Sequence, residues 1–568
     1  MTDGPKPALL PGALGSPPGR RHVLQIVLVL AVCALVRISV VHQTEMIARD
    51  GVFYVRMARD WSDHGTRWML DNYSREPGYG VALGAVRGWL VDCGGSEGLG
   101  GWELAGQLIS VAGTLASIAA VWWLAGVFFN WRAAWAAALL LGIGRNWVAV
   151  GSDVLSEGLA LALQTWAIVF ALLAFRRLQR LGRSALLWSA ISGAAIGAAC
   201  LVARESMLIA ALVAALWLAF AVRAGKGASM PVRVWPLSLM CIAAMAAGIA
   251  LTAGPYFLAV GGLSHQLADS GHAPPALGAA GGLLATVYVL EHGIFYEMFK
   301  KLVEAMHGVM AVAVGIWLTV RVAGRAARGK LPESIQPKLH WPGGLLIVGW
   351  LALFTPLMVF FGMRYSNVSF RYMMLMAAML APLGGAGVIV VGELIAHLAE
   401  RAGRRLPATV AVGVFAGALA VGTGLHAMRP LHADKGYFRQ AGEFLGRAAS
   451  ADETILTDNA WMLHYSDHRG EVVKVHNMWI DPRDLLASLH ESKAGLLALS
   501  DRHVDGYKKN VPPNPALRRF LDSGVFEEID SFTQDKPRTP EIVRVYRVDR
   551  QKLPTDIPSA PEPPLDGR

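Results

Sequence analysis

Long apolar runs, separated by short polar segments, occupy the first three quarters of the chain. A spanning helix needs about 20 apolar residues, and eleven runs approach this length. The runs begin near residues 23, 104, 133, 155, 185, 206, 235, 303, 343, 373 and 408. The first, 23–41, exceeds the ~7–15-residue core of a cleavable signal peptide, so it is predicted to remain as an anchor. The pattern predicts a polytopic α-helical membrane domain over 23–427, after an N-terminal tail of residues 1–22.

Beyond residue 428 the pattern becomes polar and charged, with short alternating segments. Four segments predict strands and two predict helices. The strands are ETILT, EVVKV, AGLLALS and EIVRVYRV, and the helices are GYFRQAGEFLGRAA and PRDLLASLHES. We therefore expect a small α/β domain over 428–552. The Pro-rich end, 553–568, is predicted to be disordered.

The segment between the first two apolar runs, 43–103, is longer than a simple connection requires. Within it Phe53, Tyr54, Met57 and Trp61 recur at helical spacing, with charged residues on the other faces. This pattern is typical of a helix lying in the membrane interface. It indicates either a functional loop or a simple membrane contact.

Composition supports the membrane assignment, because 54% of the residues are hydrophobic and only 17% are charged. The net charge of +10 does not indicate nucleic-acid binding, since its basic residues gather in short loops on one side of the predicted topology. These residues are Arg20, Arg21, Arg132, Arg176, Arg177, Arg180, Arg183, Arg223, Lys226, Arg233, Arg321, Arg325, Arg328, Lys330, Lys338, Arg401, Arg404 and Arg405. The positive-inside rule then predicts a cytoplasmic N-terminus, with segment 43–103 and the C-terminal domain outside. The four cysteines indicate neither a disulfide framework nor a zinc site.

Ionisable residues at membrane depth cost about 2.5 kcal/mol or more on insertion scales, so those present need a reason. On the predicted outer side the candidates are Asp50, Tyr54, Arg75, Glu76, Asp153, Glu157, Arg204, His272, His292, Arg364, Arg371 and Tyr372. Each has a structural alternative. Asp50 suits a helix N-cap, Arg75 and Glu76 a local salt bridge, and Arg371 a helix anchor that snorkels. Asp153 and Glu157 are four residues apart, which predicts one shared helix face. Two acids there could bind a metal, hold an arginine, or cap the helix from Ser152 or Asp153.

Three short motifs occur in this outer region: Asp50 followed by Tyr54, the sequence REPGYG from Arg75, and SDVLSEGLALAL from Ser152. Together they resemble the GT-C membrane glycosyltransferases. The resemblance is to the branch of dolichyl-phosphate-mannose protein mannosyltransferases and the lipid A aminoarabinose transferase. That branch often has two adjacent acids after the first span, whereas here Gly51 follows Asp50.

The resemblance implies an inverting transfer of a sugar from a polyprenyl phosphate to a lipid, glycan or protein acceptor at the outer face of the membrane. It implies that Asp50 is the base, which removes the proton of the acceptor hydroxyl. Arginine suits the departing phosphate, so the donor-phosphate candidates are Arg371, Tyr372, Arg204 and Arg364. The substrate-binding candidates are Arg75, Glu76, Asp153, Glu157 and Tyr54. His272 and His292 could hold a divalent metal ion, although their spacing matches no metal motif.

Two other functions remain open. A transporter or flippase of a lipid-linked substrate commonly shows duplicated halves and polar groups near the midplane. This chain shows no internal repeat, and its polar groups gather at one face. An inactive scaffold with a C-terminal binding module is the third hypothesis. The Ala-, Gly- and Arg-rich composition predicts a bacterial cytoplasmic membrane as the location.

Overall fold

The computed structural model describes residues 19–225, 234–261, 294–326, 339, 341–365, 369–473, 475, 479–506, 512–534 and 541–555. The chain divides into two compact units, which are treated separately below. The first unit comprises Met1–Val41, Met57–Trp89 and Leu104–Arg429. The second comprises His42–Arg56, Leu90–Glu103 and Pro430–Arg568, so it includes two pieces from the N-terminal part of the chain.

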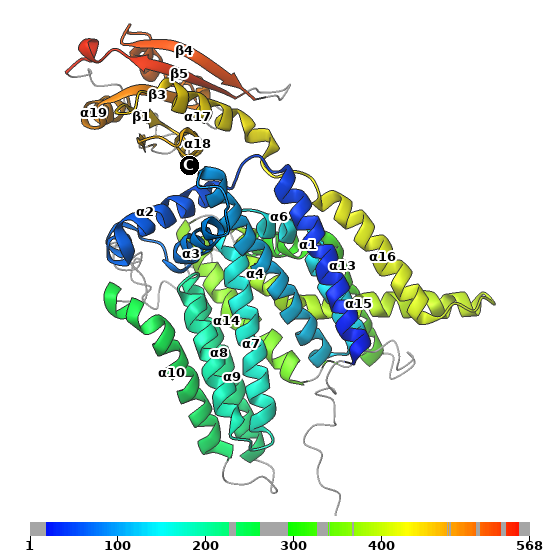
Figure 1. Cartoon of the computed structure of the whole chain (residues 1–568). Coiled ribbons are helices and arrows are strands. Elements are labelled where there is room, and N and C mark those ends of the chain that lie inside the picture. The colour runs from blue at the N-terminus through cyan, green and yellow to red at the C-terminus, as the bar shows by residue number, and fades with distance from the viewer. Residues whose placement is uncertain are drawn as a thin grey trace, which may run out of the picture. The chain divides into compact units, whose positions relative to one another are not determined.

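Helices lie at all eleven positions where the sequence predicts a spanning run (Figure 1). They are α1 (Arg20–Gln43), α4 (Leu99–Phe128), α5 (Trp131–Gly142) with α6 (Arg145–Ser152), α7 (Ser156–Leu178), α8 (Ser184–Cys200), α9 (Met207–Gly225), α10 (Val234–Val260), α13 (Ile294–Ala326), α14 (Trp341–Tyr365), α15 (Met374–Arg401) and α16 (Ala408–Ala427). In the described part of the chain, eight helices are long and apolar enough to cross a membrane, or nine if α5 and α6 form one broken span. Two shorter apolar helices are Ser184–Cys200 and Gly344–Pro356. The chain is a multi-pass membrane protein.

Within the first unit, α8 packs against both α7 and α10, and α9 packs against α10 and α14 (Figure 1). The helix α15 is buried over most of its apolar stretch, from Met374 to Val390, and packs against α5, α13 and α16. Its sequence MAAMLAPLGGAG is rich in small residues. Small side chains let helix backbones approach closely, which drives association where lipid and protein are equally apolar.

A sharp break of 64° separates α5 from α6, where the sequence analysis expects one continuous span. Arg37 of α1 lies against this break, with none of its surface exposed. Its guanidinium donates to the carbonyl oxygens of Gly142 at 2.9 Å and Trp147 at 3.3 Å. It also donates to Cys33 O at 3.1 Å and to Thr114 Oγ1 at 3.0 Å. Irregular backbone at membrane depth requires buried donors for its carbonyls, and Arg37 supplies them.

The short helix α6 is also tied to two helices late in the chain. Asn146 donates to Glu304 O at 2.6 Å, and Trp147 Nε1 donates to Ala305 O at 3.2 Å. These carbonyls precede His307, where α13 is interrupted by a left-handed residue with φ of 61°. Arg145 donates to His426 O of α16 at 2.9 Å. The segment that leads from α6 to Asp153 is therefore anchored by three neighbouring helices.

The helix predicted around Phe53 is present as α2 (Arg49–Asn72), which has a kink at Gly65, and is followed by α3 (Gly78–Asp92). Part of its apolar face packs on α3, where Met57 is fully buried. A Cβ at Gly80 would lie 2.5 Å from Met57 Cε, so the glycine leaves room for the Met57 side chain against α3. Protein contacts therefore cover part of the stripe that the sequence analysis assigned to the interface.

The second unit contains a five-stranded sheet in the order β2-β1-β3-β5-β4. Its strands are β1 (Thr454–Thr457), β2 (Gly470–Val472), β3 (Ala494–Ser500), β4 (Phe526–Thr533) and β5 (Ile542–Val548). The strands β2, β1 and β3 are parallel, whereas β5 is antiparallel to both β3 and β4. Its helices are α17 (Gly436–Ala448), α18 (Ala460–Ser466), α19 (Pro482–Ser492) and α20 (Pro515–Leu521). The predicted α/β domain is confirmed, with all four predicted strands and both predicted helices present.

Alternating side chains of β1 and β3 supply two apolar cores, one on each face of the sheet. Leu456, Leu497 and Leu499 pack with α19 and α20, while Ile455 and Leu496 pack with α17 and α18. Alternation with a period of two explains why one strand serves both cores. The strand β4, which is not predicted from the sequence, lies at the sheet edge and has the polar sequence FEEIDSFT. An edge strand tolerates charge because one side of it is unpaired.

Candidate functional site

Asp50 lies in the first turn of α2, in the part of that helix that belongs to the second unit. Because α2 begins at Arg49, Asp50 is inside the helix and does not occupy the N-cap that the structural alternative requires. A carboxylate in the first turn interacts favourably with the helix dipole. Tyr54, one turn later, is 8% exposed.

Asp153 lies between α6 and α7, in extended backbone with φ of −113° and ψ of 168°. Its Oδ1 accepts from the backbone N–H of Val154 at 2.8 Å. The helix α7 begins only at Ser156, with Leu155 as an N-cap that makes no side-chain bond. The expectation that Asp153 shares a helix face with Glu157, or that Ser152 or Asp153 caps this helix, is therefore wrong. The extended stretch separates the two carboxylates.

Glu157 and Arg371 form an ion pair, so Glu157 holds an arginine, which is one of the roles that the sequence allows for it. Glu157 is in the first turn of α7, and Arg371 is in the short 3-10 helix η3 (Phe370–Met373) that leads into α15. Arg371 Nη1 lies 3.2 Å from Glu157 Oε1, and the two side chains are 31% and 23% exposed. The half-buried pair thus joins the starts of two long helices.

Glu76 and Arg204 form a second, longer pair. Arg204 Nε lies 4.0 Å from Glu76 Oε1, and these side chains are 25% and 15% exposed. Arg204 begins the 3-10 helix η1 (Arg204–Ser206) ahead of α9. The Gly78 backbone N–H donates to Leu201 O at 2.7 Å, which fixes the REPGYG segment beside this helix. The partner of Glu76 thus comes from a distant part of the sequence.

Glu205 lies near both pairs, because its carboxylate is repelled by Glu76 and Glu157 and attracted by Arg204. Five ionisable side chains from four separate segments therefore form one cluster in the first unit. They are Glu76, Glu157, Arg204, Glu205 and Arg371. Burial raises the pKa of Glu76 above its ordinary value of 4.5, against the opposing effect of Arg204 and Arg75. Desolvation disfavours the charged carboxylate, which makes it a stronger proton acceptor.

The remaining predicted residues lie beside these pairs or outside the described part of the chain. Tyr372 is 51% exposed next to Arg371, and Arg75 is half-buried next to Glu76. The side chain of Arg364 and the whole of His272 and His292 lie outside the described residues. Within the described residues, no group of three or more His, Cys, Asp or Glu side chains is arranged to hold a metal ion.

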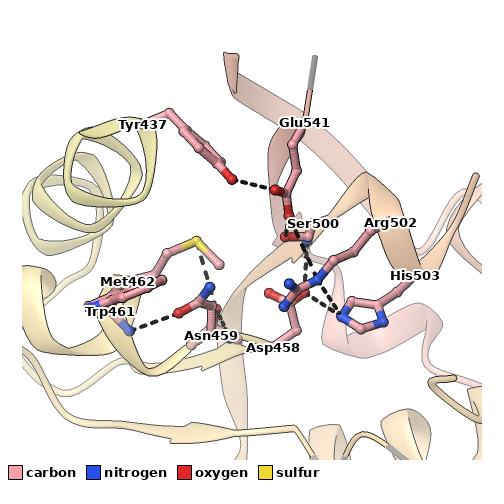
Figure 2. Close-up of polar contacts among 10 residues, drawn as sticks. Tyr437, Asp458, Asn459, Trp461, Met462, Ser500, Arg502, His503 and Glu541 are labelled. Atoms are coloured by element: carbon pink, nitrogen blue, oxygen red, sulfur yellow. Dashed lines mark hydrogen bonds and ion pairs between the residues drawn. The ribbon is translucent and has the colours of Figure 1, made fainter. Parts of the chain in front are cut away.

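A separate polar cluster lies in the second unit, at the carboxyl ends of β1 and β3 (Figure 2). His503 Nε2 lies 3.1 Å from Asp458 Oδ2. Glu541 accepts from Tyr437 Oη at 2.6 Å and lies 3.7 Å from Arg502 Nε. Burial, followed by the adjacent carboxylate, raises the pKa of Tyr437, so the phenol remains a donor.

The position of this cluster is typical of ligand sites in open α/β sheets, because β2 and β3 lie on opposite sides of β1. Its centre is closed, however. The side chains of Asp458, His503 and Glu541 are 0%, 1% and 3% exposed. Asp458 pairs with His503, and Glu541 pairs with Tyr437 and Arg502, so the cluster joins β1, β3, β5 and α17 inside the domain.

The fold is that of the GT-C membrane glycosyltransferases, as the resemblance in the sequence predicts. No protein-family model and no curated protein matches the sequence. The solved structures that match include the oligosaccharyltransferase AglB from Archaeoglobus fulgidus, in complex with an inhibitory peptide and a dolichol-phosphate. It shares 12% identity with this chain at a TM-score of 0.54, over 94% of this chain and 75% of AglB.

Another match is ArnT from Cupriavidus metallidurans bound to undecaprenyl phosphate. It shares 13% identity at a TM-score of 0.53, and the alignment covers 92% of this chain and 97% of ArnT. A mutant of the arabinofuranosyltransferase AftD from Mycobacteria matches at a TM-score of 0.50, over 94% of this chain and 42% of AftD. At these identities the likeness concerns the fold.

Proposed function

We propose that this protein is an inverting glycosyltransferase. It moves a sugar from a polyprenyl phosphate to a lipid, glycan or protein acceptor at the outer face of a bacterial cytoplasmic membrane. The observation that carries the proposal is the cluster in the first unit, in which two arginines and three glutamates meet from four segments. Such groups are costly in a membrane protein and indicate a functional site. The folds of AglB and ArnT, whose solved structures hold lipid phosphates, support this choice.

In the proposed reaction, Asp50 removes the proton from the acceptor hydroxyl. The hydroxyl oxygen then forms a bond to the anomeric carbon of the sugar. The bond from that carbon to the phosphate oxygen breaks, and the polyprenyl phosphate leaves with the electron pair. A single displacement of this kind inverts the anomeric configuration, and it requires a base within hydrogen-bond reach.

Arg371 and Arg204 have the chemistry needed by the leaving phosphate. Charge grows on the phosphate oxygen as the bond breaks, so cationic donors lower the barrier selectively. A guanidinium carries five N–H donors, and its pair with a carboxylate fixes its orientation. We assign Glu157 and Glu76 the role of orienting these two arginines. Arg75, Asp153, Tyr54 and Tyr372 are proposed to contact substrate.

The decisive test is Asp50→Asn in the full-length protein, with a radiolabelled polyprenyl-phosphate sugar as donor. We expect transfer to fall by about 10²- to 10⁴-fold, which is the usual contribution of a general base. The matched control is Asp63→Asn, which makes the same change at an exposed position of the same helix. Normal turnover by Asp50→Asn would show that the base is assigned wrongly.

The same labelled donors distinguish the competing functions. Release of polyprenyl phosphate together with labelled acceptor supports a transferase. Movement of the intact donor across proteoliposomes without transfer supports a flippase, and neither activity supports a scaffold.

A further inference from the structure

The start of segment 43–103 is part of the apolar core of the C-terminal domain. Met46, four residues before Asp50, is 1% exposed and packs in the apolar core made by α17, α18 and one face of the sheet. Its neighbours in this core include Phe438, Ala441 and Tyr465. A residue from the N-terminal part of the chain thus completes a domain formed almost 400 positions later.

Two aromatic side chains of α18 form hydrogen bonds with the backbone N–H and C=O of Ile47, the residue after Met46. Tyr465 Oη accepts from the Ile47 N–H at 3.0 Å, and Trp461 Nε1 donates to Ile47 O at 2.8 Å. Ile47 is itself 1% exposed. Because Ile47 precedes α2 by only two residues, these bonds fix the point from which that helix starts.

Further contacts bind Glu45, near the start of segment 43–103, and Glu103, at its end. Arg439 of α17 donates to Glu45 O and lies over the Tyr465 ring, 5.3 Å from its centroid. At the far end of the outer segment, His464 Nε2 lies 3.0 Å from Glu103 Oε1, and these side chains are 4% and 17% exposed. Both ends of segment 43–103 are therefore fastened to α17 and α18.

We propose that Arg439, Trp461, His464 and Tyr465 form a clamp that positions Asp50 for catalysis, which gives the C-terminal domain its role. The proposal rests on the proposed function, in which Asp50 is the base. A clamp is needed because a catalytic group that is misplaced by about 1 Å can lose roughly 10² in rate. Arg439, Trp461 and Tyr465 act through the backbone of residues 45 and 47, and His464 acts through the Glu103 side chain. All four are therefore positioning residues.

The test compares Tyr465→Phe and Trp461→Phe, alone and together, with the wild-type protein. Each change removes one bond to Ile47 and keeps an aromatic ring. The matched control is Tyr437→Phe, which removes a buried tyrosine hydroxyl in the same core, bonded to Glu541 instead of Ile47. Two quantities are measured on the full chain: hydrogen exchange of peptides covering residues 42–56, and kcat and KM for a polyprenyl-phosphate sugar.

We expect faster exchange over 42–56 in the clamp variants, with kcat about tenfold lower or more and KM for the donor little changed. Tyr437→Phe should leave both quantities near wild type. Unchanged exchange in the double variant would show that there is no clamp. Faster exchange with unchanged kcat would overturn its positioning role. If the wild-type protein transfers no sugar, the proposed function fails and the positioning role fails with it, while hydrogen exchange still decides whether the contacts act as a clamp.

Discussion

The ion pairs of the first unit show how individual side chains acquire a defined environment. Arg371 and Arg204 are recognisable in the sequence as candidate phosphate ligands, because each stands at the predicted outer end of an apolar run. Their partners Glu157 and Glu76 lie more than 100 positions away and are set by helix packing. Four of the five members of the cluster, all but Glu205, are therefore predicted from the sequence, but their pairing is not.

Glu76 provides a prediction for pH dependence. Burial raises its folded-state pKa above the ordinary value of 4.5, so the ionised carboxylate destabilises the fold at higher pH. This cost declines as the pH falls through the raised pKa and is absent well below 4.5. We expect Glu76→Gln to have a higher Tm than wild type at neutral pH, with the difference vanishing in acid. Thermal unfolding of the purified protein across pH measures this.

The exposed Asp63→Asn serves as the control, because removing an exposed carboxylate should leave Tm unchanged at both ends of the pH range. A Tm for Glu76→Gln below wild type at neutral pH would mean that the pair with Arg204 outweighs desolvation. Sugar transfer by the same variant should fall, since Gln carries no charge to orient Arg204.

Arg37 and the α5–α6 break illustrate what a hydrophobic pattern leaves undetermined about an element. The run from 133 is apolar except for Arg145 and Asn146, and hydropathy alone does not reveal its 64° bend. One sign of the bend in the sequence is Arg37, the single arginine of the apolar run 23–41. Its N–H groups need hydrogen-bond acceptors elsewhere in the protein. Its four bonds in the described structure all go to neutral oxygens.

We expect Arg37→Met to destabilise the protein, because it removes the guanidinium that donates to the carbonyls of Gly142 and Trp147. An unsatisfied buried polar group costs about 1–3 kcal/mol. Gly151→Ala should also lower Tm, since the alanine Cβ would lie 2.6 Å from Arg37 Nε. The measurement is Tm in detergent.

Ser117→Ala is the matched control for these variants. Ser117 is also fully buried on α4, but its hydroxyl donates only to Gly113 O of its own helix. Unchanged Tm in Arg37→Met would show that the break does not depend on this side chain.

For the whole molecule, the order of apolar and polar segments predicts both the helical membrane region and the α/β domain. The similarity to GT-C structures persists at 12–13% identity because hydrophobic patterning and helix order survive where individual residues do not. The order of apolar and polar segments does not predict how the chain divides into its two compact units. Residues 42–56 and 90–103 join the C-terminal domain through contacts such as Met46 in its core, which no local sequence signal indicates.

The orientation of the molecule is testable with a cysteine that the chain already has. Cys93 is exposed and lies just after α3, whereas Cys33, Cys200 and Cys241 are buried. The positive-inside rule places Cys93 outside the cytoplasm, so a membrane-impermeant maleimide should label it in spheroplasts. Inverted vesicles should be labelled only after detergent is added. Cys93→Ser removes the signal if the label is specific, and labelling of sealed inverted vesicles would place segment 43–103, with Asp50, on the cytoplasmic side and exclude an outer-face transferase.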